Sequence, residues 1–315
     1  MSNHRARYGR LSRAAGLVTL AFASLTGVAM AGDSPAASPV TPAAYTFQSL
    51  DYPGSSQTIF WGINDFGELA GQFAMNGGTS HAMVYRHGHF EMLDPAQLGT
   101  YFSAAGGPND RGVTYGAYAD ASGIQHGFIS RSGHLKTEDF PGHLNSNVDG
   151  INEFGTILGV YWDADGAFHG ILRRGENWDT PFDVAGAAET YPLGLNDLGE
   201  SVGYWDTNPK APQPHGFFRD AEGKITTLDV PGAAYTVAFA INDVGQIAGY
   251  YWSPNSPLHS FVESNGKFQS LDMPGTVEVL VTTINNFGVV SGEYIDTKGQ
   301  RHGFIGTPTP AEQKH

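Results

Sequence analysis

The sequence has no cysteine, few basic residues and no long apolar run after its first 30 residues. Without cysteine the chain forms no disulfide and carries out no thiolate chemistry. Its 17 Lys and Arg face 31 Asp and Glu, a net charge of −14, and such a surface repels nucleic acid and anionic lipid. We therefore expect no nucleic-acid partner and no membrane span in the mature protein.

The first 31 residues are predicted to be a secretory signal peptide. An apolar run over residues 14–30 ends in the sequence Ala29–Met30–Ala31, which matches a small-residue cleavage site. Four arginines precede this run: Arg5, Arg7, Arg10 and Arg13. Their loss would take the net charge from −14 to −18. We expect a periplasmic or extracellular protein with a Pro/Ser/Ala linker over residues 32–43 and a polar tail over 308–315.

One unit occurs six times along the rest of the chain. It is N-x-x-G-x-x-x-G, in steps of 43 to 46 residues, and its Asn is Asn64, Asn109, Asn152, Asn196, Asn242 and Asn285. The first Gly suits a turn that needs a positive φ angle. A period of this length with strand-like content is typical of a β-propeller with one four-stranded blade per repeat.

The two ends of the repeat region complement each other. The sixth repeat stops after its third strand, at His302–Gly303–Phe304, and so lacks a fourth strand. The segment Tyr45–Asp51 resembles a fourth strand that has no repeat of its own. We therefore predict an all-β, six-bladed β-propeller of four-stranded antiparallel blades over residues 44–307, closed by the N-terminal strand completing the last blade.

The repeat resembles a known family. The patterns I-N-D-x-G-x-I-x-G, at 241–249, H-G-F, at 302–304, and L-D-x-P-G, at 228–232, are similar to the HAF repeat of predicted extracellular bacterial proteins. The resemblance covers nearly the whole mature chain and implies a secreted, propeller-like architecture. It implies no catalytic residues, because the family has no settled activity.

Each repeat also carries one His and one Asp at fixed places. The His residues are His81, His126, His169, His215, His259 and His302, and the Asp residues are Asp51, Asp94, Asp139, Asp183, Asp229 and Asp272. Metal ligation needs several such side chains to converge. Residues repeated once per blade are spread around a ring, so we expect the His to donate to a carboxylate or carbonyl between strands. No metal site is predicted.

Function is expected where the repeats differ. Three second strands end in aromatic pairs, and we propose these as ligand-binding residues: Tyr161, Trp162, Tyr204, Trp205, Tyr251 and Trp252. Tyr191 and Tyr235, near the start of two first strands, are further candidates. Aromatic faces suit sugar rings, on the face that carries the turns between second and third strands. The alternative is packing between adjacent blades.

Carboxylates offer a second hypothesis. Seven residues before each Asn stands a varied, mostly polar set: Gln57, Phe102, Asn145, Glu189, Tyr235 and Glu278. Glu189 and Glu278 are candidates for a catalytic pair if they face each other across a central channel. The alternative is that both are solvated. Asp163–Ala164–Asp165–Gly166 resembles part of a calcium loop but lacks the full set, so turn formation is the alternative there.

The sequence thus predicts a secreted propeller that binds a carbohydrate or cell-surface glycan. A glycoside hydrolase or polysaccharide lyase with its site at the channel mouth is the first alternative, although no H-E-x-x-H, phosphate-binding loop or dinucleotide fingerprint occurs. A protein-interaction scaffold is the second. No cofactor is expected apart from the calcium alternative.

Overall fold

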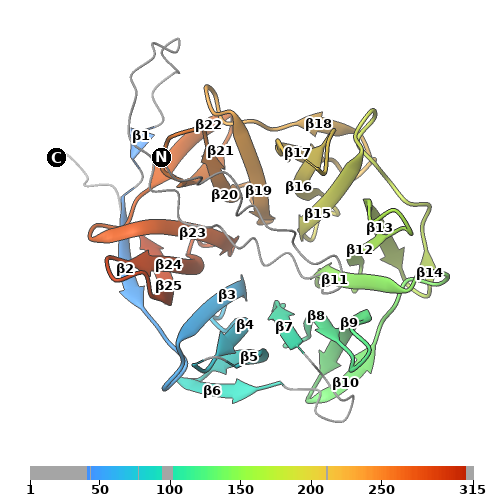
Figure 1. Ribbon diagram of the computed structural model, residues 1–315, viewed down its shortest axis with the longest axis horizontal. Helices are drawn as coiled ribbons and strands as arrows, with labels where there is room; N and C mark the ends of the chain where they lie inside the picture. Colours follow the sequence, from blue (N-terminus) through green and yellow to red (C-terminus); the bar gives the residue numbers. More distant parts are fainter. Residues whose placement is uncertain (1–40, 43, 77, 94–101, 211, 310–315) are drawn as a thin grey trace, which may run out of the picture.

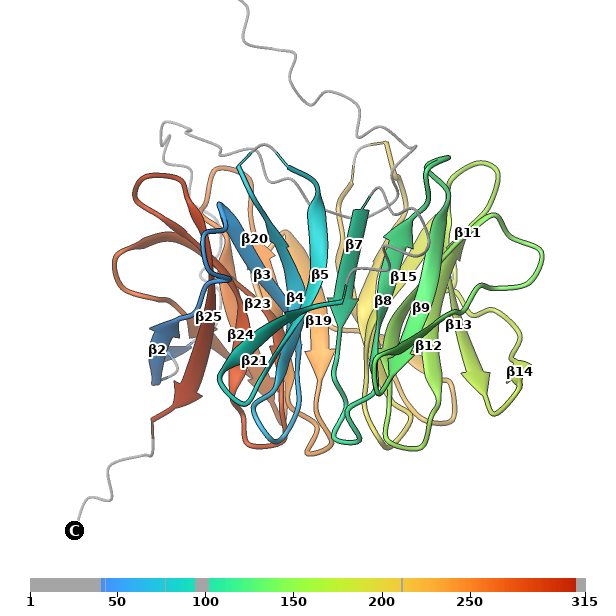
Figure 2. The same ribbon diagram turned by 90° about the horizontal axis from the view of Figure 1, so that it is seen from below.

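The computed structural model describes residues 41–42, 44–76, 78–93, 102–210 and 212–309, and all regular structure in these ranges is β-strand. Viewed down the short axis, the sheets stand around a common centre and follow one another in sequence order (Figure 1). The side view shows their strands running between the two ends of the ring (Figure 2). Across the described ranges, no helix has the length and apolar character needed to cross a membrane.

Each repeat contributes strands that run in order from the centre to the outside (Figure 1). The first strands are β3 (Gln57–Ile63), β7 (Phe102–Gly106), β11 (Asn145–Ile151), β15 (Glu189–Leu195), β19 (Tyr235–Ile241) and β23 (Thr276–Ile284). The second strands are β4 (Leu69–Ala74), β8 (Thr114–Ala119), β12 (Ile157–Trp162), β16 (Ser201–Asp206), β20 (Ile247–Trp252) and β24 (Val290–Asp296). The third strands are β5 (Ser80–Arg86), β9 (Gln125–Arg131), β13 (Phe168–Arg174), β17 (His215–Arg219), β21 (His259–Ser264) and β25 (Arg301–Pro308). The fourth strands are β6 (His89–Met92), β10 (His134–Thr137), β14 (Asn177–Trp178), β18 (Ile225–Thr227) and β22 (Lys267–Leu271).

Consecutive strands of a repeat pair antiparallel. Repeats 2, 3 and 4 form separate four-stranded sheets, and β1 (Thr41–Pro42) adds a parallel fifth strand to β22 of repeat 5. A single parallel bridge between Arg301 and Gln57 links β25 to β3 and joins the first and last repeats into one eight-stranded sheet. None of these sheets closes on itself within the described residues, so the ring in Figure 1 is built from sheets placed side by side.

The N-terminal strand β2 (Tyr45–Ser49) pairs antiparallel with β25, from Tyr45 opposite Pro308 to Ser49 opposite Phe304. The Tyr45 hydroxyl donates to the Gly288 carbonyl at 2.9 Å, and Phe47 packs edge-on against Phe304. β2 therefore occupies the place of the fourth strand that the last repeat lacks, as the sequence predicts. This pairing covers an edge that would otherwise expose unpaired backbone groups.

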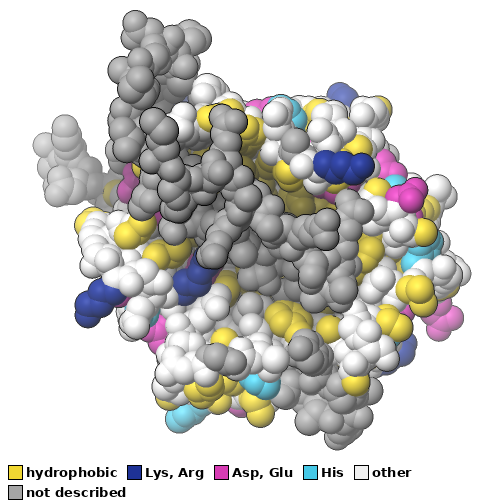
Figure 3. Space-filling model, viewed as in Figure 1, with side chains coloured by type: hydrophobic (Ala, Val, Ile, Leu, Met, Phe, Trp, Pro, Cys, Tyr) yellow, Lys and Arg dark blue, Asp and Glu magenta, His cyan; other side chains and the backbone are white. Residues whose placement is uncertain are grey.

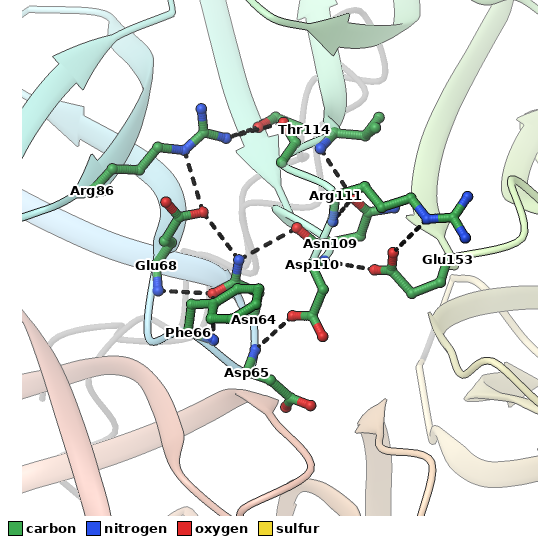
Figure 4. A network of polar contacts seen from close by, with 12 residues as sticks. Asn64, Asp65, Phe66, Glu68, Arg86, Asn109, Asp110, Arg111, Thr114 and Glu153 are labelled. Carbon is green, nitrogen blue, oxygen red and sulfur yellow. Dashed lines mark hydrogen bonds and ion pairs between the residues drawn. The ribbon is translucent and has the colours of Figure 1, made fainter.

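The Asn of the repeat holds two turns at once. Asn64 Oδ1 accepts the backbone N–H groups of Phe66 at 3.1 Å and Glu68 at 2.9 Å, which shapes its own turn. Its Nδ2 donates to the carbonyl of Asn109 in the next repeat at 3.3 Å (Figure 4). The same bond joins every Asn to the next at 2.8–3.3 Å, and the last returns from Asn285 to Asn64. The six Asn side chains form a closed circle of hydrogen bonds.

A second circle runs beside the first. The backbone N–H of Asp65 donates to Oδ1 of Asp110 at 2.9 Å, and the N–H of Asp110 donates to Glu153 (Figure 4). This pattern also continues around all six turns, with donor–acceptor distances of 2.5–2.9 Å. Its members are Asp65, Asp110, Glu153, Asp197, Asp243 and Asn286. The residue after the repeat Asn therefore accepts a bond from the preceding turn.

The two glycines of the repeat are required for different reasons. The first has a positive φ angle, for example 78° at Gly245, which the turn requires. The second lies under the carbonyl of the first strand. A Cβ on Gly203 would lie 2.1 Å from the Tyr191 carbonyl oxygen, and a Cβ on Gly249 would lie equally close to that of Val237. Only Gly permits this approach of the two strands.

The repeated His and Asp play the structural role expected of them. His126 Nδ1 lies 2.8 Å from a carboxylate oxygen of Asp139, and its ring stacks on Tyr118. Equivalent pairs join His169 to Asp183, His215 to Asp229, His259 to Asp272 and His302 to Asp51. Asp94, which stands at the equivalent place in the first repeat, lies outside the described residues. Each pair ties a third strand to the end of a fourth.

Replacing Asn242 by Asp tests the Asn circle. Asn242 is buried, and its Nδ2 donates to the Asn285 carbonyl and to Gln246 Oε1, both at 2.8 Å. A carboxylate keeps the shape but cannot donate, so the bond to the Asn285 carbonyl becomes an oxygen–oxygen contact and Gln246 has to turn its amide to donate instead. We expect Asn242→Asp to lower the free energy of unfolding by about 2–4 kcal/mol at pH 7, measured by urea denaturation.

The matched control is Asp197→Asn in the neighbouring circle. Its Oδ1 accepts the Glu153 N–H, and an amide oxygen retains that bond, as Asn286 does at the equivalent position. We expect this control to stay within about 0.5 kcal/mol of the wild type or above it. Equal stability of Asn242→Asp and the wild type would show that the circle contributes little.

Candidate functional site

A bulge in the first strand aims one residue per repeat at the centre. In β11 the pairing register shifts between Val148 and Gly150, so Asp149 has no opposite partner in β12. A bulge of this kind re-aims a side chain. The same shift occurs in β3, β15, β19 and β23, always three residues before the repeat Asn. The residues so placed are Trp61, Asp149, Leu193, Phe239 and Thr282, and all five line a cavity at the centre of the ring.

The first strand of repeat 2 has no such bulge at the equivalent position. Its residue there is Gly106, and a Cβ on Gly106 would lie 2.4 Å from the ring of Tyr115. Tyr115, from β8, therefore occupies the space that a larger residue would take. Its hydroxyl interacts with the Gly107 backbone, and burial raises its pKa above the ordinary range.

These residues divide the centre into two cavities. Trp61 and Phe239 stack with ring centroids 5.7 Å apart, and with Tyr115, Leu193 and Thr282 they line both cavities. One cavity is bounded by the first halves of the first strands, and we call it the central cavity. Its volume is about 110 Å³. The turn-side cavity, bounded by the Asn turns, measures about 140 Å³. Each exceeds several-fold the roughly 10–15 Å³ that one water needs.

The central cavity is aromatic with a few polar groups. Its aromatic lining is Trp61, Tyr115, Tyr191, Tyr204, Phe239 and Tyr250. Its polar lining is Asn147, Asp149, Thr282, Glu293 and Arg301. This composition, mostly apolar surface with a small number of fixed polar groups, is that of a small-molecule site.

Four buried polar atoms of this lining have no hydrogen-bond partner among the described residues: Trp61 Nε1, Asn147 Oδ1, Asp149 Oδ2 and Glu293 Oε2. The first is a donor and the other three are acceptors at neutral pH when the acids are ionised. Buried polar atoms are normally satisfied by protein, water or ligand. Their partners must therefore come from whatever occupies the cavity.

Neighbouring polar groups in the cavity are paired. Asn147 Nδ2 donates to the Tyr191 hydroxyl at 3.2 Å, which fixes the amide so that its oxygen faces away from Tyr191. Arg301 Nη1 donates to Glu293 Oε1 at 2.5 Å. Burial raises the pKa of Glu293, while the charge of Arg301 lowers it. One positive and two potential negative charges thus share the lining.

Asp149 stands apart because it has no cationic partner among the described residues. Burial alone raises the pKa of Asp149 to about 8. The carboxyl group is therefore largely protonated at neutral pH and then donates a hydrogen bond rather than accepting two. A ligand that hydrogen-bonds to either form shifts this balance.

Two of the predicted aromatic residues line the central cavity. Tyr191 and Tyr204 stack with centroids 5.5 Å apart and planes 3° from parallel. Both are buried, and burial raises both pKa values far above the usual value. The structure brings them beside Asn147 and Asp149, two residues that were not among the candidates from the sequence.

The three tryptophans are not equivalent, contrary to the pattern of successive aromatic pairs. Trp162 and Trp252 follow the second Gly of their repeats by three residues, whereas Trp205 follows Gly203 by two. We call the place two residues after the second Gly the outer position. Trp205 stands there, and its ring stacks on that of His215 with centroids 4.8 Å apart. None of the three lines either cavity, so they do not form one aromatic rim.

Trp162 and Trp252 nevertheless reach the cavity through other rings. Trp162 contacts Phe168, which contacts Tyr191. Trp252 contacts Tyr250 of the lining and, on its other side, Tyr235. Two chains of aromatic contacts thus connect these tryptophans to the central cavity.

Tyr161 and Tyr251 occupy the outer position. They stack on His169 and His259, as Trp205 stacks on its His. Figure 3 shows His side chains near the rim of the face seen in Figure 1. Blade packing, the alternative considered for these tyrosines, accounts for both.

Glu189 and Glu278 lie in different first strands, β15 and β23, and neither lines the two cavities. Burial raises the pKa of Glu278, and Arg301 lowers it. Neither of the two cavities therefore brings these carboxylates together. The carboxylates that line the central cavity are Asp149 and Glu293.

The possible calcium loops are turns. Asp163 Oδ1 accepts the N–H groups of Asp165 and Ala167, and Asp120 and Asp296 do the same in their turns. Across the described ranges no group of three or more His, Asp or Glu has the geometry of a metal site.

The segment Gly199–Glu200–Ser201–Val202–Gly203 matches the G-x-S-x-G pattern of hydrolase nucleophiles, although the repeat itself sets the spacing of its glycines. That chemistry needs a strand–turn–helix with an exposed Ser. Here Ser201 is fully buried at the start of strand β16. The match therefore reflects the spacing of the repeat glycines and does not mark a nucleophile.

No family model and no curated protein matches this chain. Among solved structures, it is similar to a mutant of AofleA from Arthrobotrys oligospora, with a TM-score of 0.54 and 11% identity over 83% of this chain and 86% of that one. For the SapL1 lectin in complex with α-methyl fucoside the TM-score is 0.50 and the identity 14%, over 76% of this chain and 88% of the lectin chain. For TolB from Acinetobacter baumannii the TM-score is 0.49 and the identity 10%. That match covers 76% of this chain but only 63% of the TolB chain. Together with the four-stranded antiparallel sheets, the first two likenesses show an all-β, propeller-like fold and nothing of its chemistry.

The raised pKa of Asp149 predicts a pH dependence of stability. The folded state binds the proton more tightly than the unfolded state, so the contribution of Asp149 to stability is lost as pH rises from about 4 through about 8. Asn resembles the protonated acid and does not titrate. We expect Asp149→Asn to match the wild type at pH 4 and to exceed it by up to about 5 kcal/mol at pH 9 in urea denaturation, because each of roughly four pKa units is worth about 1.4 kcal/mol. Parallel stability curves over this range would contradict the assignment.

Proposed function

We propose that this chain is an exported, closed, six-bladed β-propeller of the HAF-repeat type whose central cavity binds a small polyhydroxylated ligand of the carbohydrate class. Two observations support the blade count and the closure. The Asn circle has six members and returns from Asn285 to Asn64. The N-terminal strand β2 pairs with β25 of the last repeat. The export signal rests on the sequence alone, since residues 1–31 lie outside the described residues.

The observation that carries the binding proposal is the set of four unpartnered polar atoms in one aromatic cavity. Asn147 Oδ1 and the Glu293 carboxylate accept hydrogen bonds, Trp61 Nε1 donates one, and Asp149 donates when protonated and accepts when ionised. A sugar offers several hydroxyl groups that each donate and accept, together with C–H faces that pack on aromatic rings. This match favours a carbohydrate over an apolar ligand, which would leave the polar atoms unsatisfied.

The ligand position differs from the face of turns between second and third strands that the sequence favoured. The tryptophans of those strands contact the cavity only through Phe168 and Tyr250. We therefore assign them a supporting role. The likeness to a lectin solved with α-methyl fucoside is compatible with a sugar ligand but rests on fold alone.

A second candidate is a glycan-active hydrolase or lyase in the same cavity. It is favoured by Asp149, because burial raises the pKa of Asp149 to about 8 and a carboxylic acid that is protonated at neutral pH serves as a general acid. Glu293 is the other carboxylate of the lining, and its bond to Arg301 favours its ionised form. Such an enzyme would release products, whereas a binding protein would not.

Binding to a panel of mono- and oligosaccharides tests the proposal. We expect saturable binding of at least one sugar by isothermal titration calorimetry, with a change in Trp fluorescence because Trp61 lines the cavity. Asn147→Ala removes a polar anchor and should weaken that binding about tenfold or more, the equivalent of about 1.4 kcal/mol. Each mixture is also analysed for new reducing ends and unsaturated products.

Trp205→Phe is the matched control, because Trp205 lies at the outer position that Phe73 fills in repeat 1. It should bind within about twofold of the wild type. Products that disappear in Asp149→Asn would favour the enzyme. Absence of binding across the panel, or equal losses in Asn147→Ala and Trp205→Phe, would contradict the cavity proposal.

A further inference from the structure

The Asn turns expose an apolar side chain at the same place in five of six repeats. The residue two positions after the Asn is Phe66, Phe154, Leu198, Val244 or Phe287, and each is 59–76% exposed. These are five of the nine large hydrophobic side chains that are exposed within the described residues. We call them the turn crown. Soluble proteins seldom gather exposed apolar side chains in this way without a partner surface.

Turn geometry does not require an apolar residue there. In repeat 2 the same position is Arg111, and its backbone N–H bonds to the Asn109 side chain just as that of Phe66 bonds to Asn64. The turn therefore accepts a charged, well-solvated residue without change. The apolar choice in the other five repeats needs another reason.

The hydrogen-bond circles place the turns together at one end of the ring. Neighbouring turns are joined by two bonds each, so the crown surrounds a common centre, the lower edge of the ring in Figure 2. The turn-side cavity of about 140 Å³ opens at this centre, and all members of the second circle line it. The crown therefore borders a hollow rather than a flat patch.

That hollow is strongly acidic. Five members of the second circle are carboxylates, and the sixth is Asn286. Burial first, and then the neighbouring carboxylates, raise the pKa values of Asp110 and Asp197. Asp110 and Asp197 each use Oδ1 in the circle, and no described residue is hydrogen-bonded to Oδ2 of either. Arg111 lies 3.4 Å from Glu153 and offsets one of the charges.

We propose that the turn crown is a docking surface for a protein segment that presents a Lys or Arg flanked by apolar side chains. The cation enters the acidic hollow and relieves the repulsion among the carboxylates, while the flanking side chains cover the crown. Charge argues against the other occupants. A second copy would bring five more carboxylates face to face with these, and an anionic lipid surface would be repelled. This surface is independent of the central cavity, at the other side of the Trp61–Phe239 layer.

Synthetic peptides serve as the probe. A fluorescein-labelled peptide of alternating Leu and Lys should bind the mature protein saturably in fluorescence anisotropy at 150 mM salt. The same length with Glu in place of Lys should not bind, and one with Ser in place of Leu should bind at least tenfold more weakly. The last comparison separates docking from simple attraction to an acidic protein.

Two sets of variants locate the site. Phe66→Ser with Phe154→Ser and Phe287→Ser removes the largest crown residues and should weaken binding at least tenfold. Asp110→Asn with Asp197→Asn removes two charges while each Oδ1 still accepts its N–H, as Asn286 does, and should weaken binding similarly. Unchanged circular dichroism and melting temperature show that each variant is folded.

Matched controls lie elsewhere on the surface. Met75→Ser with Met92→Ser removes exposed apolar side chains outside the crown, and Glu176→Gln with Glu222→Gln removes two exposed charges outside the circle. Both should bind within twofold of the wild type. Losses as large in these controls as in the crown variants would overturn the proposal. So would self-association in sedimentation velocity, or binding to phosphatidylglycerol vesicles, that the crown substitutions abolish.

Discussion

The amide of the repeated Asn is the interaction on which the architecture depends. Its oxygen closes its own turn, and its nitrogen holds the carbonyl of the next turn, so one side chain fixes both local shape and neighbour. Six such bonds complete a circle and set the distance between adjacent repeats. A second constraint acts within each repeat, because the first strand approaches the second so closely that Gly203 has no room for a Cβ. An Asn and two glycines per repeat are thus enough to define the ring.

This economy leaves other positions free to carry function. The bulge three residues before the Asn aims its side chain at the centre whatever the residue is, and the repeats place Trp61, Asp149, Leu193, Phe239 and Thr282 there. The turn residues after the Asn are similarly free. The scaffold therefore presents two chemically different cavities, one aromatic and one acidic, on either side of a single layer of side chains. On the acidic side, burial and mutual repulsion disfavour the ionised forms of Asp110 and Asp197 and so raise their pKa values.

Much of the fold follows from the sequence because the repeat states its constraints six times. The turn glycines, the structural role of the repeated His and Asp and the pairing of β2 with the last repeat were all predictable from spacing. The bulge was not, because strict alternation along a strand gives no sign of an extra residue, and so Asp149 was not among the predicted site residues. Trp205 was grouped with Trp162 because each follows a Tyr, although Trp205 stands two residues after its Gly and Trp162 stands three after its own. The exposure of Phe66 and its equivalents was not predicted, since exposure is not visible in a pattern.

The central claim is that a ring closed by Asn side chains positions the bulge residues around a ligand cavity. A high-resolution crystal structure of the mature protein, soaked with the sugar that binds most tightly, tests it most directly. The account predicts the complete circle of six Asn bonds and sugar density within hydrogen-bond distance of Asn147 Oδ1 and Asp149 Oδ2. Sugar bound on the outer rim beside Trp162 or Trp252, or those two oxygens paired with other protein groups, would contradict it.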